Sequence, residues 1–463
     1  HQTVRIDAMK NALGFGLGTL GRDMMYGMVS MYLMFYLTDV LDLSTGALAA
    51  VTVVLVLMRI FDAVNDPFMG YVVDNTHTRW GKFKPWITIG ACGWCIGTVL
   101  LFTDWGVRGW QFITLFIVVY LVFEVAYTMN DISYYGMMPS LTRDKAERER
   151  IGVVTRICAN IGLFSIVVGI VPVTQWLTGV LGDAQRAWQL LAIVLSVIAI
   201  AFQSITLIFA HETVHVKSES TPLRELVSVI FKNDQLLWVS LTFLLYMSGY
   251  TLLTSLGLHY FKYLVGDEGK YPIFALVLGV TQLGTLLAFP LISARMPRRQ
   301  VFTLGCGASV VGYVVFISAG SSMVVILCAG LFLFFGEALF QVLLMMYIAD
   351  SVEYGEWKLG RRNESITFSL QPFIYKLSGA ISSGLMGICL IWSGVESATG
   401  PADVTESGTW IFRLFMMVVP LILTVAAFLV FRHGYRIDEA TYSSIVASLQ
   451  DSEKTSTPEE EAR

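Results

Sequence analysis

The stretch that decides the fold is residues 47–72, which read ALAAVTVVLVLMRIFDAVNDPFMGYV. Residues 47–58 contain no charge, and the charges that follow are Arg59, Asp62 and Asp66. A helix of about 20 mostly apolar residues is long enough to cross the ~30 Å hydrocarbon core of a bilayer. We therefore expect this stretch to form a membrane-spanning helix that carries charged side chains inside the membrane.

The composition of the whole chain supports this assignment. Of its 463 residues, 55% are hydrophobic and 14% are charged, whereas soluble domains carry about 25% charged residues. This shortage of charge excludes a soluble enzyme, a disordered protein and a nucleic-acid-binding protein, so we expect no nucleic-acid partner. The six cysteines lie in apolar stretches, and their spacing predicts neither a disulfide framework nor a metal centre.

Apolar segments of this kind recur along the chain. Twelve of them lie near 13–38, 47–72, 85–103, 111–136, 151–179, 187–210, 236–264, 271–294, 300–319, 322–349, 365–393 and 408–431. The predicted organisation is an N-terminus at 1–12, a six-helix bundle at 13–210, a middle loop at 211–235, a second six-helix bundle at 236–431 and a tail at 432–463. This pattern predicts an all-α membrane protein with twelve transmembrane helices in two six-helix halves. Such a chain is typical of transporters of the major facilitator type, with a substrate site near the midplane between the halves.

Lys and Arg in the short loops predict the orientation of the chain. One set of alternate loops holds 16 of them, whereas the other set holds Arg108, Arg186 and Lys270. Because short loops rich in Lys and Arg stay in the cytoplasm, we expect both termini and the middle loop on the cytoplasmic side. The expected location is the plasma (inner) membrane, with the lipid bilayer as partner and a monomer as the assembly.

Charges in the second predicted helix mark a candidate cation site. A charged side chain at the centre of a membrane helix costs roughly 2.5–3.5 kcal/mol on insertion scales, so it should pair or face a watery cavity. Asp62 and Asp66 are four residues apart and therefore share a helical face, with Asn65 beside them. Two carboxylates and an amide oxygen are hard donors that suit Na⁺, and the carboxylates suit a proton equally well. Pro67 is expected to loosen the backbone and free a carbonyl there.

The loop that follows this helix has the pattern Gly70-x3-Asp74-x4-Arg79-x-Gly81-Lys82. Small and charged residues at these positions favour a tight cytoplasmic turn that breaks and re-forms salt bridges as the halves rock. The alternative interpretation is a solvated loop whose positive charges only orient the chain.

Four other predicted helices contribute polar groups within the membrane. The helix at 13–38 carries Arg22 and Asp23, and the helix at 111–136 carries Thr128 and Asp131. The helices at 151–179 and 365–393 carry Arg156 and Lys376. The tyrosines beside them are Tyr26, Tyr127, Tyr134, Tyr135 and Tyr375. A sugar presents an apolar C–H face and a fringe of hydroxyls, so aromatic rings next to carboxylates and basic groups fit it well. The alternative interpretation is that the charges form structural ion pairs and the tyrosines serve packing or an interfacial belt.

Three stretches carry a resemblance to a known family. They are residues 59–67 (RIFDAVNDP), 78–86 (TRWGKFKPW) and 350–360 (DSVEYGEWKLG). On these motifs the chain resembles the glycoside–pentoside–hexuronide:cation symporters, and the similarity extends across all twelve predicted helices. The resemblance implies that Na⁺, Li⁺ or H⁺ moves together with a glycoside. It implies no catalysed reaction and no cofactor other than this coupling cation.

The same resemblance implies roles for individual residues. The cation is expected at Asp62, Asn65, Asp66 and Thr128. The sugar is expected to be held by Asp23 and Asp131, helped by Arg22, Tyr26, Tyr127, Tyr135 and Arg156. Lys376 is expected between the cation and the sugar, and Gln371 is expected to line the cavity.

The chain departs from the family pattern at three positions. Tyr135 stands where the family's melibiose carrier stacks its galactoside on a tryptophan, Gln341 replaces another tryptophan near the cavity, and Pro372 replaces a threonine. These departures leave the mechanism intact, but the identity of the sugar and the choice between Na⁺ and H⁺ stay open.

Three other functions fit the sequence less well than sugar symport. A lysolipid carrier of the same superfamily would need an apolar groove for an acyl chain, which the charged and tyrosine-rich segments disfavour. A membrane-embedded enzyme would need a catalytic or metal motif such as HExxH or a P-loop, and the sequence contains neither. A channel is disfavoured because two halves with a central loop suit occlusion better than an open pore.

Overall fold

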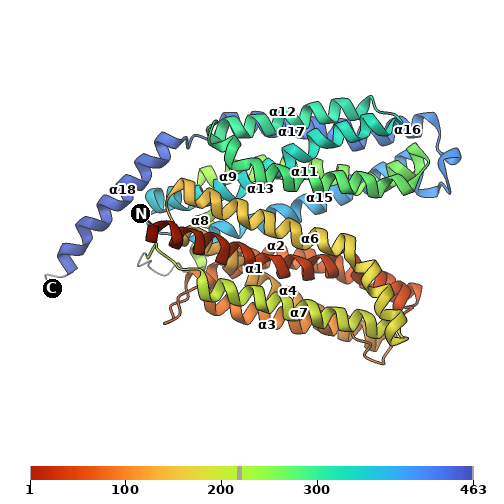
Figure 1. Ribbon diagram of the computed structural model, residues 1–463, viewed down its shortest axis with the longest axis horizontal. Coiled ribbons are helices and arrows are strands. Elements are labelled where there is room, and N and C mark those ends of the chain that lie inside the picture. The colour runs from red at the N-terminus through yellow and green to blue at the C-terminus, as the bar shows by residue number, and fades with distance from the viewer. Residues whose placement is uncertain (1, 216–221, 461–463) are drawn as a thin grey trace. The chain divides into compact units, whose positions relative to one another are not determined.

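The computed structural model describes residues 2–215 and 222–460, and the regular elements in these ranges are all helical (Figure 1). Eleven helices or continuous helical stretches among these residues are long and apolar enough to cross a membrane. Two other long helices fall outside this set: the polar α18 (Glu439–Glu460), and α1 (Gln2–Phe35), whose middle carries Arg22 and Asp23. Helix α1 corresponds to the first predicted membrane helix. Together with the eleven others it accounts for the twelve predicted helices, so the predicted fold class is confirmed.

The chain divides by its contacts into two units, each of which is described by itself. Unit 1 comprises residues 1–226 and 363–369, and unit 2 comprises residues 227–362 and 370–463. Unit 1 therefore contains a short segment that comes from far along the chain.

Unit 1 is built around α1, which packs along both α6 and α7 (Figure 1). Its other long helices are α2 (Thr45–Asp74), α3 (Lys84–Leu101), α4 (Trp110–Gly136), α6 (Lys145–Leu181) and α7 (Ala184–Phe209). Its short elements are η1 (Tyr36–Val40), α5 (Met138–Leu141), η2 (Leu223–Glu225) and α14 (Glu364–Phe368). Helix α4 packs against both α2 and α3, so polar residues on α4 can contact side chains of either helix.

Local sequence signals begin and end several of these helices. The side chains of Ser44, Asp144 and Asp183 accept a backbone N–H in the first turn of α2, α6 and α7, which satisfies donors that a helix start leaves unpaired. Gly182 ends α6 with φ of 72°, a left-handed conformation that glycine adopts without steric cost.

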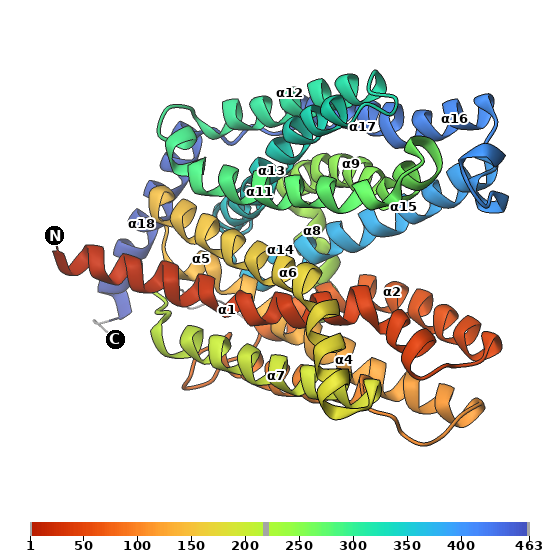
Figure 2. The ribbon, with the colours of Figure 1, turned by 45° about the vertical axis from the view of Figure 1, so that its right-hand side comes forward.

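Unit 2 repeats the arrangement of long packed helices. Its helices are α8 (Leu226–Lys232), α9 (Asp234–Ser255), α10 (Gly257–His259), η3 (Tyr260–Val265), η4 (Glu268–Lys270), α11 (Tyr271–Ser293), α12 (Arg298–Ile317), α13 (Met323–Leu359), α15 (Leu370–Ser393), η5 (Val395–Ser397), η6 (Pro401–Asp403), α16 (Glu406–Arg413), η7 (Leu414–Val418), α17 (Val419–Gly434) and α18 (Glu439–Glu460). Helix α13 packs against α9, α11 and α12. Figure 2 shows α12 beside α17.

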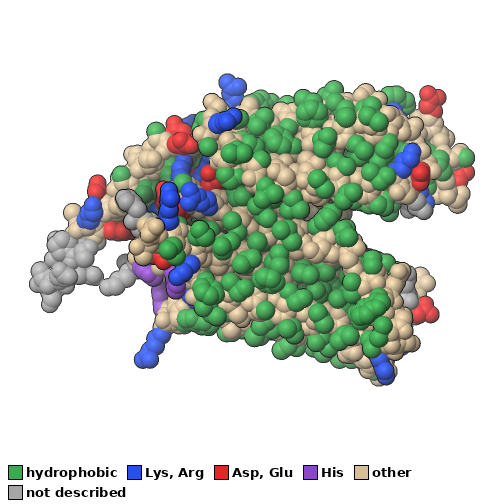
Figure 3. All heavy atoms as spheres, in the orientation of Figure 1, with side chains coloured by type: hydrophobic (Ala, Val, Ile, Leu, Met, Phe, Trp, Pro, Cys, Tyr) green, Lys and Arg blue, Asp and Glu red, His purple; other side chains and the backbone are tan. Residues whose placement is uncertain are grey.

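The outer faces of the helices are apolar. Val64 of α2, Val197 of α7 and Leu291 of α11 are 72%, 64% and 69% exposed. Figure 3 shows apolar side chains over the middle of the visible helices, with most charged side chains near the helix ends. An apolar surface of this extent suits lipid rather than water, as a multi-pass membrane protein requires.

Glycines let neighbouring helices of unit 1 approach closely. A Cβ atom on Gly90 of α3 would lie 2.6 Å from the backbone nitrogen of Asn130 on α4. A Cβ atom on Gly21 of α1 would lie 2.6 Å from the Cα of Ala199 on α7. Small residues at helix contacts are the usual device by which membrane helices gain van der Waals contact.

We expect Gly90→Ala to destabilise the protein, because the added methyl group would meet the α4 backbone. Overpacking of this kind costs typically about 1–3 kcal/mol. The matched control is Gly307→Ala on α12, where a Cβ atom would meet nothing within 4 Å. Thermal unfolding in detergent measures the difference, and equal stability of the two variants would contradict the packing argument.

Candidate functional site

The central polar cluster of unit 1 forms around Arg22 of α1. Its guanidinium donates a hydrogen bond to Asp131 of α4 and forms an ion pair with it. The two side chains are 2% and 10% exposed. The guanidinium carbon also lies 5.6 Å from the ring centre of Tyr127 and 4.9 Å from that of Tyr135. Arg22 and Asp131 thus compensate each other's buried charge, and the aromatic faces add cation–π attraction.

Asp23, the neighbour of Arg22, belongs to the same cluster. The hydroxyl of Thr19 donates a hydrogen bond to its carboxylate. Arg22, Arg156 and Asp131 lie within electrostatic reach of that carboxylate. The cluster therefore combines two acids with two bases.

Tyr26 extends the cluster along α1. Its ring stacks on that of Tyr127 with centroids 5.1 Å apart, while its side chain stays 42% exposed. Unit 1 thus gathers the predicted sugar residues of the first six helices, namely Arg22, Asp23, Tyr26, Tyr127, Asp131, Tyr135 and Arg156.

A buried amide network positions this cluster. Asn130 donates hydrogen bonds to the side-chain oxygen of Gln203 at 2.9 Å and to the carbonyl of Ile87 at 3.0 Å. Gln203 in turn donates to the carbonyl of Gly18 at 2.6 Å. The network joins α4 to α3, α7 and α1. It therefore fixes the register between α4 and α1 at which Asp131 meets Arg22.

The residues predicted for the cation lie on α2 and α4, which pack together. Asp62, Asp66 and Thr128 are 4%, 0% and 1% exposed, and Asn65 is partly buried. The Thr128 hydroxyl oxygen is buried and has no hydrogen-bond partner among the described residues. An orphaned oxygen on a helix that packs against the one carrying two buried carboxylates fits a ligand such as a small cation.

The backbone of α2 offers a further oxygen near this set. Pro67 lies inside α2 and has no N–H, so the carbonyl of Ala63 loses its helical donor. Among the residues that the structure describes, no three His, Cys, Asp or Glu side chains gather into a metal cluster. The donor set predicted from the sequence has two carboxylates with amide and hydroxyl oxygens, and the Ala63 carbonyl adds an oxygen on the same helix. Oxygens of this kind suit a monovalent cation or a proton.

Gln371 and Lys376 lie on α15 of unit 2. Gln371 is 4% exposed, and its side-chain oxygen is buried without a hydrogen-bond partner in the described part of the chain. Lys376 is partly buried. That these two residues join the unit 1 cluster in one cavity stays a prediction.

A family model described as MFS/sugar transport protein matches residues 14–439. The chain belongs to this family, the glycoside–pentoside–hexuronide symporters of the major facilitator superfamily. It is 32% identical to the lactose permease of Lactobacillus helveticus, over 94% of this chain and 71% of that protein. It is 31% identical to the raffinose carrier protein of Pediococcus pentosaceus, over 94% of this chain and 70% of that protein.

Solved structures share the fold of this symporter family member. A bacterial homologue of the iron transporter ferroportin, solved in an outward-facing state, aligns with a TM-score of 0.66 and 16% identity. The alignment covers 95% of this chain and 99% of that chain. At this identity the likeness concerns the fold alone.

The sequence analysis missed one acid in unit 1 of the transporter. Glu124 of α4 is 9% exposed, and Tyr120 donates a hydrogen bond to it. Asp62 also lies within electrostatic reach of Tyr120. Glu124 precedes Thr128 by four residues, and this helical spacing is the signal that could have found it.

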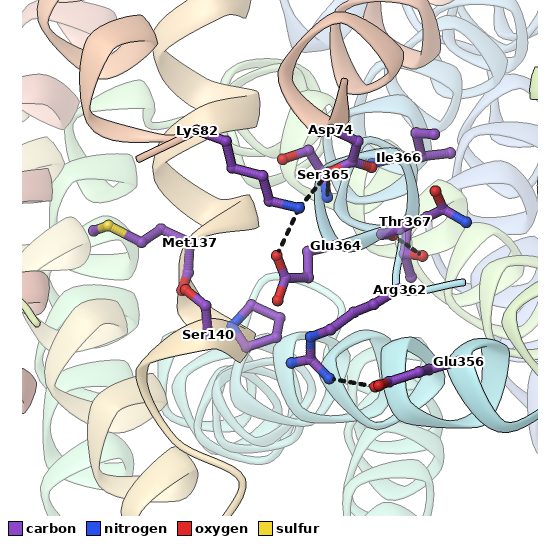
Figure 4. Close-up of polar contacts among 12 residues, drawn as sticks. Asp74, Lys82, Met137, Ser140, Glu356, Arg362, Glu364, Ser365, Ile366 and Thr367 are labelled. Carbon is purple, nitrogen blue, oxygen red and sulfur yellow. Dashed lines mark hydrogen bonds and ion pairs between the residues drawn. The ribbon is translucent and has the colours of Figure 1, made fainter. Parts of the chain in front are cut away.

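A second polar cluster of unit 1 lies where α14 meets α2 and the loop after it (Figure 4). The backbone N–H groups of Ser365 and Ile366 donate to the Asp74 carboxylate at 3.0 and 2.8 Å. The Lys82 ammonium lies 3.2 Å from Asp74 and 3.0 Å from Glu364. Burial lowers the pKa of Lys82, but the two carboxylates outweigh it and hold that pKa above its ordinary value. Asp74 and Lys82 therefore form the kind of ion pairs that the sequence predicts for this loop.

We expect Arg22→Gln to lower the free energy of unfolding by about 3–5 kcal/mol, because it leaves Asp131 buried without its charge partner. Adding Asp131→Asn should recover part of the loss. The control is Arg186→Gln in the exposed pair with Asp183, where a change below about 1 kcal/mol is expected. Denaturant unfolding in detergent measures all three, and equal losses in Arg22→Gln and Arg186→Gln would refute the pairing.

We expect Asp74→Ala to speed amide hydrogen exchange at Ser365 and Ile366. Losing a charged acceptor costs these N–H groups about 1.5–3 kcal/mol, which corresponds to at least about tenfold faster exchange. Asp104→Ala is the control, since Asp104 makes exposed contacts far from α14: an ion pair with Arg108 and a hydrogen bond from the Gly106 N–H. Unchanged exchange in a peptide containing residues 365 and 366 would show that Asp74 does not hold α14.

Proposed function

We infer that the protein is a secondary active symporter that couples inward flow of Na⁺, or of Li⁺ or H⁺, to uptake of a glycoside or small sugar by alternating access. The observation that carries this function is the buried Arg22–Asp131 pair, surrounded by tyrosine rings within a membrane transporter of the sugar transport family. The proposed location is the plasma membrane with both termini cytoplasmic. A monomer suffices for this mechanism.

The chemistry of the α1–α4 cluster supports a sugar as substrate. Carboxylates accept hydrogen bonds from sugar hydroxyls, Arg22 and Arg156 donate to ring and hydroxyl oxygens, and the exposed Tyr26 ring offers a face for C–H groups. Two similar proteins are named for lactose and raffinose, which supports a glycoside. An acyl chain would gain nothing from these charges, which argues against a lysolipid.

Helix α4 offers a physical route for coupling the cation to the sugar. It carries Thr128 of the proposed cation site and Asp131 of the proposed sugar site, three residues apart and thus on neighbouring positions of one face. A cation between Asp62 and Asp66 relieves the repulsion of two like charges, which steadies α2 against α4. The coupling must be reciprocal, and 1–3 kcal/mol corresponds to roughly 5–150-fold in affinity.

The function is tested by counterflow in proteoliposomes loaded with unlabelled sugar. Labelled lactose and raffinose are added outside, with and without Na⁺, Li⁺ or a pH gradient. We expect transient accumulation of at least one sugar and stimulation by at least one cation. A protein that exchanges neither these sugars nor a wider panel of glycosides would refute sugar symport.

We expect Asp66→Cys to abolish cation-stimulated sugar binding, because it removes the most buried carboxylate of the proposed cation site. Sugar affinity measured with and without cation should become equal, whereas the unmodified protein should show a difference of roughly 5–150-fold. Asp451→Cys on the exposed face of α18 is the control. A retained Na⁺ or pH effect in Asp66→Cys would remove Asp66 from the site.

A further inference from the structure

Unit 2 contains a buried carboxylate to which the proposed function assigns no role. Glu337 lies in the middle of α13 and is 3% exposed. The side-chain amides of Gln282 on α11 and Gln341 on α13 both donate to the same oxygen of Glu337, each at 2.6 Å. An acid in the interior of a membrane helix is costly and marks a functional site by default.

Three buried tyrosines lie in the surroundings of this acid. Tyr246 and Tyr250 of α9 and Tyr313 of α12 lie within electrostatic reach of Glu337. Gln282 also donates to the Tyr250 hydroxyl at 3.3 Å. The Tyr313 side chain is fully buried, and its hydroxyl has no hydrogen-bond partner among the residues described. An orphaned hydroxyl next to a carboxylate is a place where a proton or a water completes the network.

The cluster can satisfy Glu337 in both of its protonation states. In the observed arrangement two amide N–H groups face one carboxylate oxygen, as an ionised acid requires. A half-turn of either amide presents its carbonyl oxygen instead, which accepts a hydrogen bond from a protonated acid. The Tyr313 hydroxyl makes no direct hydrogen bond to Glu337, but through a bridging water it can donate toward the ionised acid or accept from the protonated one. Gln282 and Gln341 thus form a direct shell that works with either state.

We propose that Glu337 is a proton-binding site of the transport cycle, separate from the Asp62 and Asp66 site. This inference rests on the proposed function and makes H⁺ a coupling ion. One O–H bond forms on the Glu337 carboxylate when hydronium gives up its proton, and the same bond breaks when water takes the proton on the other side. One proton is carried inward in each turn of the cycle.

Few other ionisable groups near the middle of these helices compete for this proton. The elements packed against α13 bring Tyr246 and Tyr250 from α9, Tyr313 from α12 and Tyr271 from the first turn of α11. The charged residues of α9 and α12 stand at the first turn of each helix, namely Asp234, Arg298 and Arg299. Helix α18 packs against α13 as well, and its residues Glu439, Asp451, Glu453 and Lys454 are exposed. Helix α15 also packs against α13 and carries Lys376 as its one basic residue. Glu337 is thus the carboxylate among the described groups near the middle of these helices, so it is the group to which the proton is assigned.

The test is Glu337→Gln, because a glutamine imitates the protonated acid. The purified variant is reconstituted into proteoliposomes, and the labelled sugar is lactose or raffinose, whichever shows counterflow with the unmodified protein. Counterflow needs no net proton movement and should stay within about twofold of the unmodified protein, whereas accumulation driven by an inward pH gradient should fall at least about tenfold. Proton uptake or release on adding sugar to weakly buffered detergent solution, read with a pH indicator, should disappear. Glu406→Gln, an exposed acid at the start of α16, is the matched control and should change none of these.

The possible outcomes separate this inference from the proposed function. If the unmodified protein shows no sugar counterflow, the proposed function fails. If it shows counterflow but no pH-driven accumulation, or if Glu337→Gln keeps that accumulation, the assignment of Glu337 is overturned. Should Glu337→Gln not fold, Tyr313→Phe carries the test: counterflow should persist while the pH of half-maximal driven uptake shifts, and an unshifted profile overturns the proposal.

Discussion

The ion pair between Arg22 and Asp131 is the constraint on which unit 1 depends. Both charges are buried within a membrane protein, where an unpaired charge would cost several kcal/mol. Helices α1 and α4 must therefore meet at one register, and the Asn130–Gln203–Gly18 network holds them there. Helix α1 carries Arg22 and Asp23 at this register and falls outside the most apolar set of helices. The tyrosine ring faces around Arg22 further stabilise its buried positive charge by cation–π attraction, without adding another charge.

Helix α4 connects this pair to the rest of the proposed machinery. Glu124, Thr128 and Asp131 follow one another on it at helical spacing, so in the proposed function α4 links the acid pair of α2 to the sugar cluster as one rigid element. At the far end of α2, Asp74 and Lys82 bind α14, whose residues come from much later in the chain. Unit 2 carries its own buried acid, Glu337, within a shell of amides and tyrosines. Each unit thus buries acidic groups inside the membrane, and proton or cation movement gives a physical reason for keeping them there.

Much of this arrangement could be predicted from the sequence because it is local. Apolar segments of sufficient length predict the helices, and the four-residue spacing of Asp62 and Asp66 places them on one face. The pairing of Arg22 with Asp131 could not be derived in this way, because the partners are 109 residues apart. Glu124 and Thr128 have helical spacing, and so do Glu337 and Gln341 within the apolar segment 322–349. No spacing rule predicts that Gln282 contacts Glu337 from 55 residues away, or that Asp74 meets Ser365 across 291 residues.

The sequence by itself determined that this protein is a helical membrane protein, because hydrophobic length and charge content are properties of the chain alone. It also determined which side chains are costly in a membrane and therefore need a reason to be there. Only the tertiary structure decided which of those charges meet. Arg22 pairs with Asp131, and Asp23 accepts a hydrogen bond from Thr19. Lys82 forms ion pairs with both Asp74 and Glu364. The physical reason is that an ion pair depends on distances of a few ångströms between helices, which helix packing sets and sequence spacing does not.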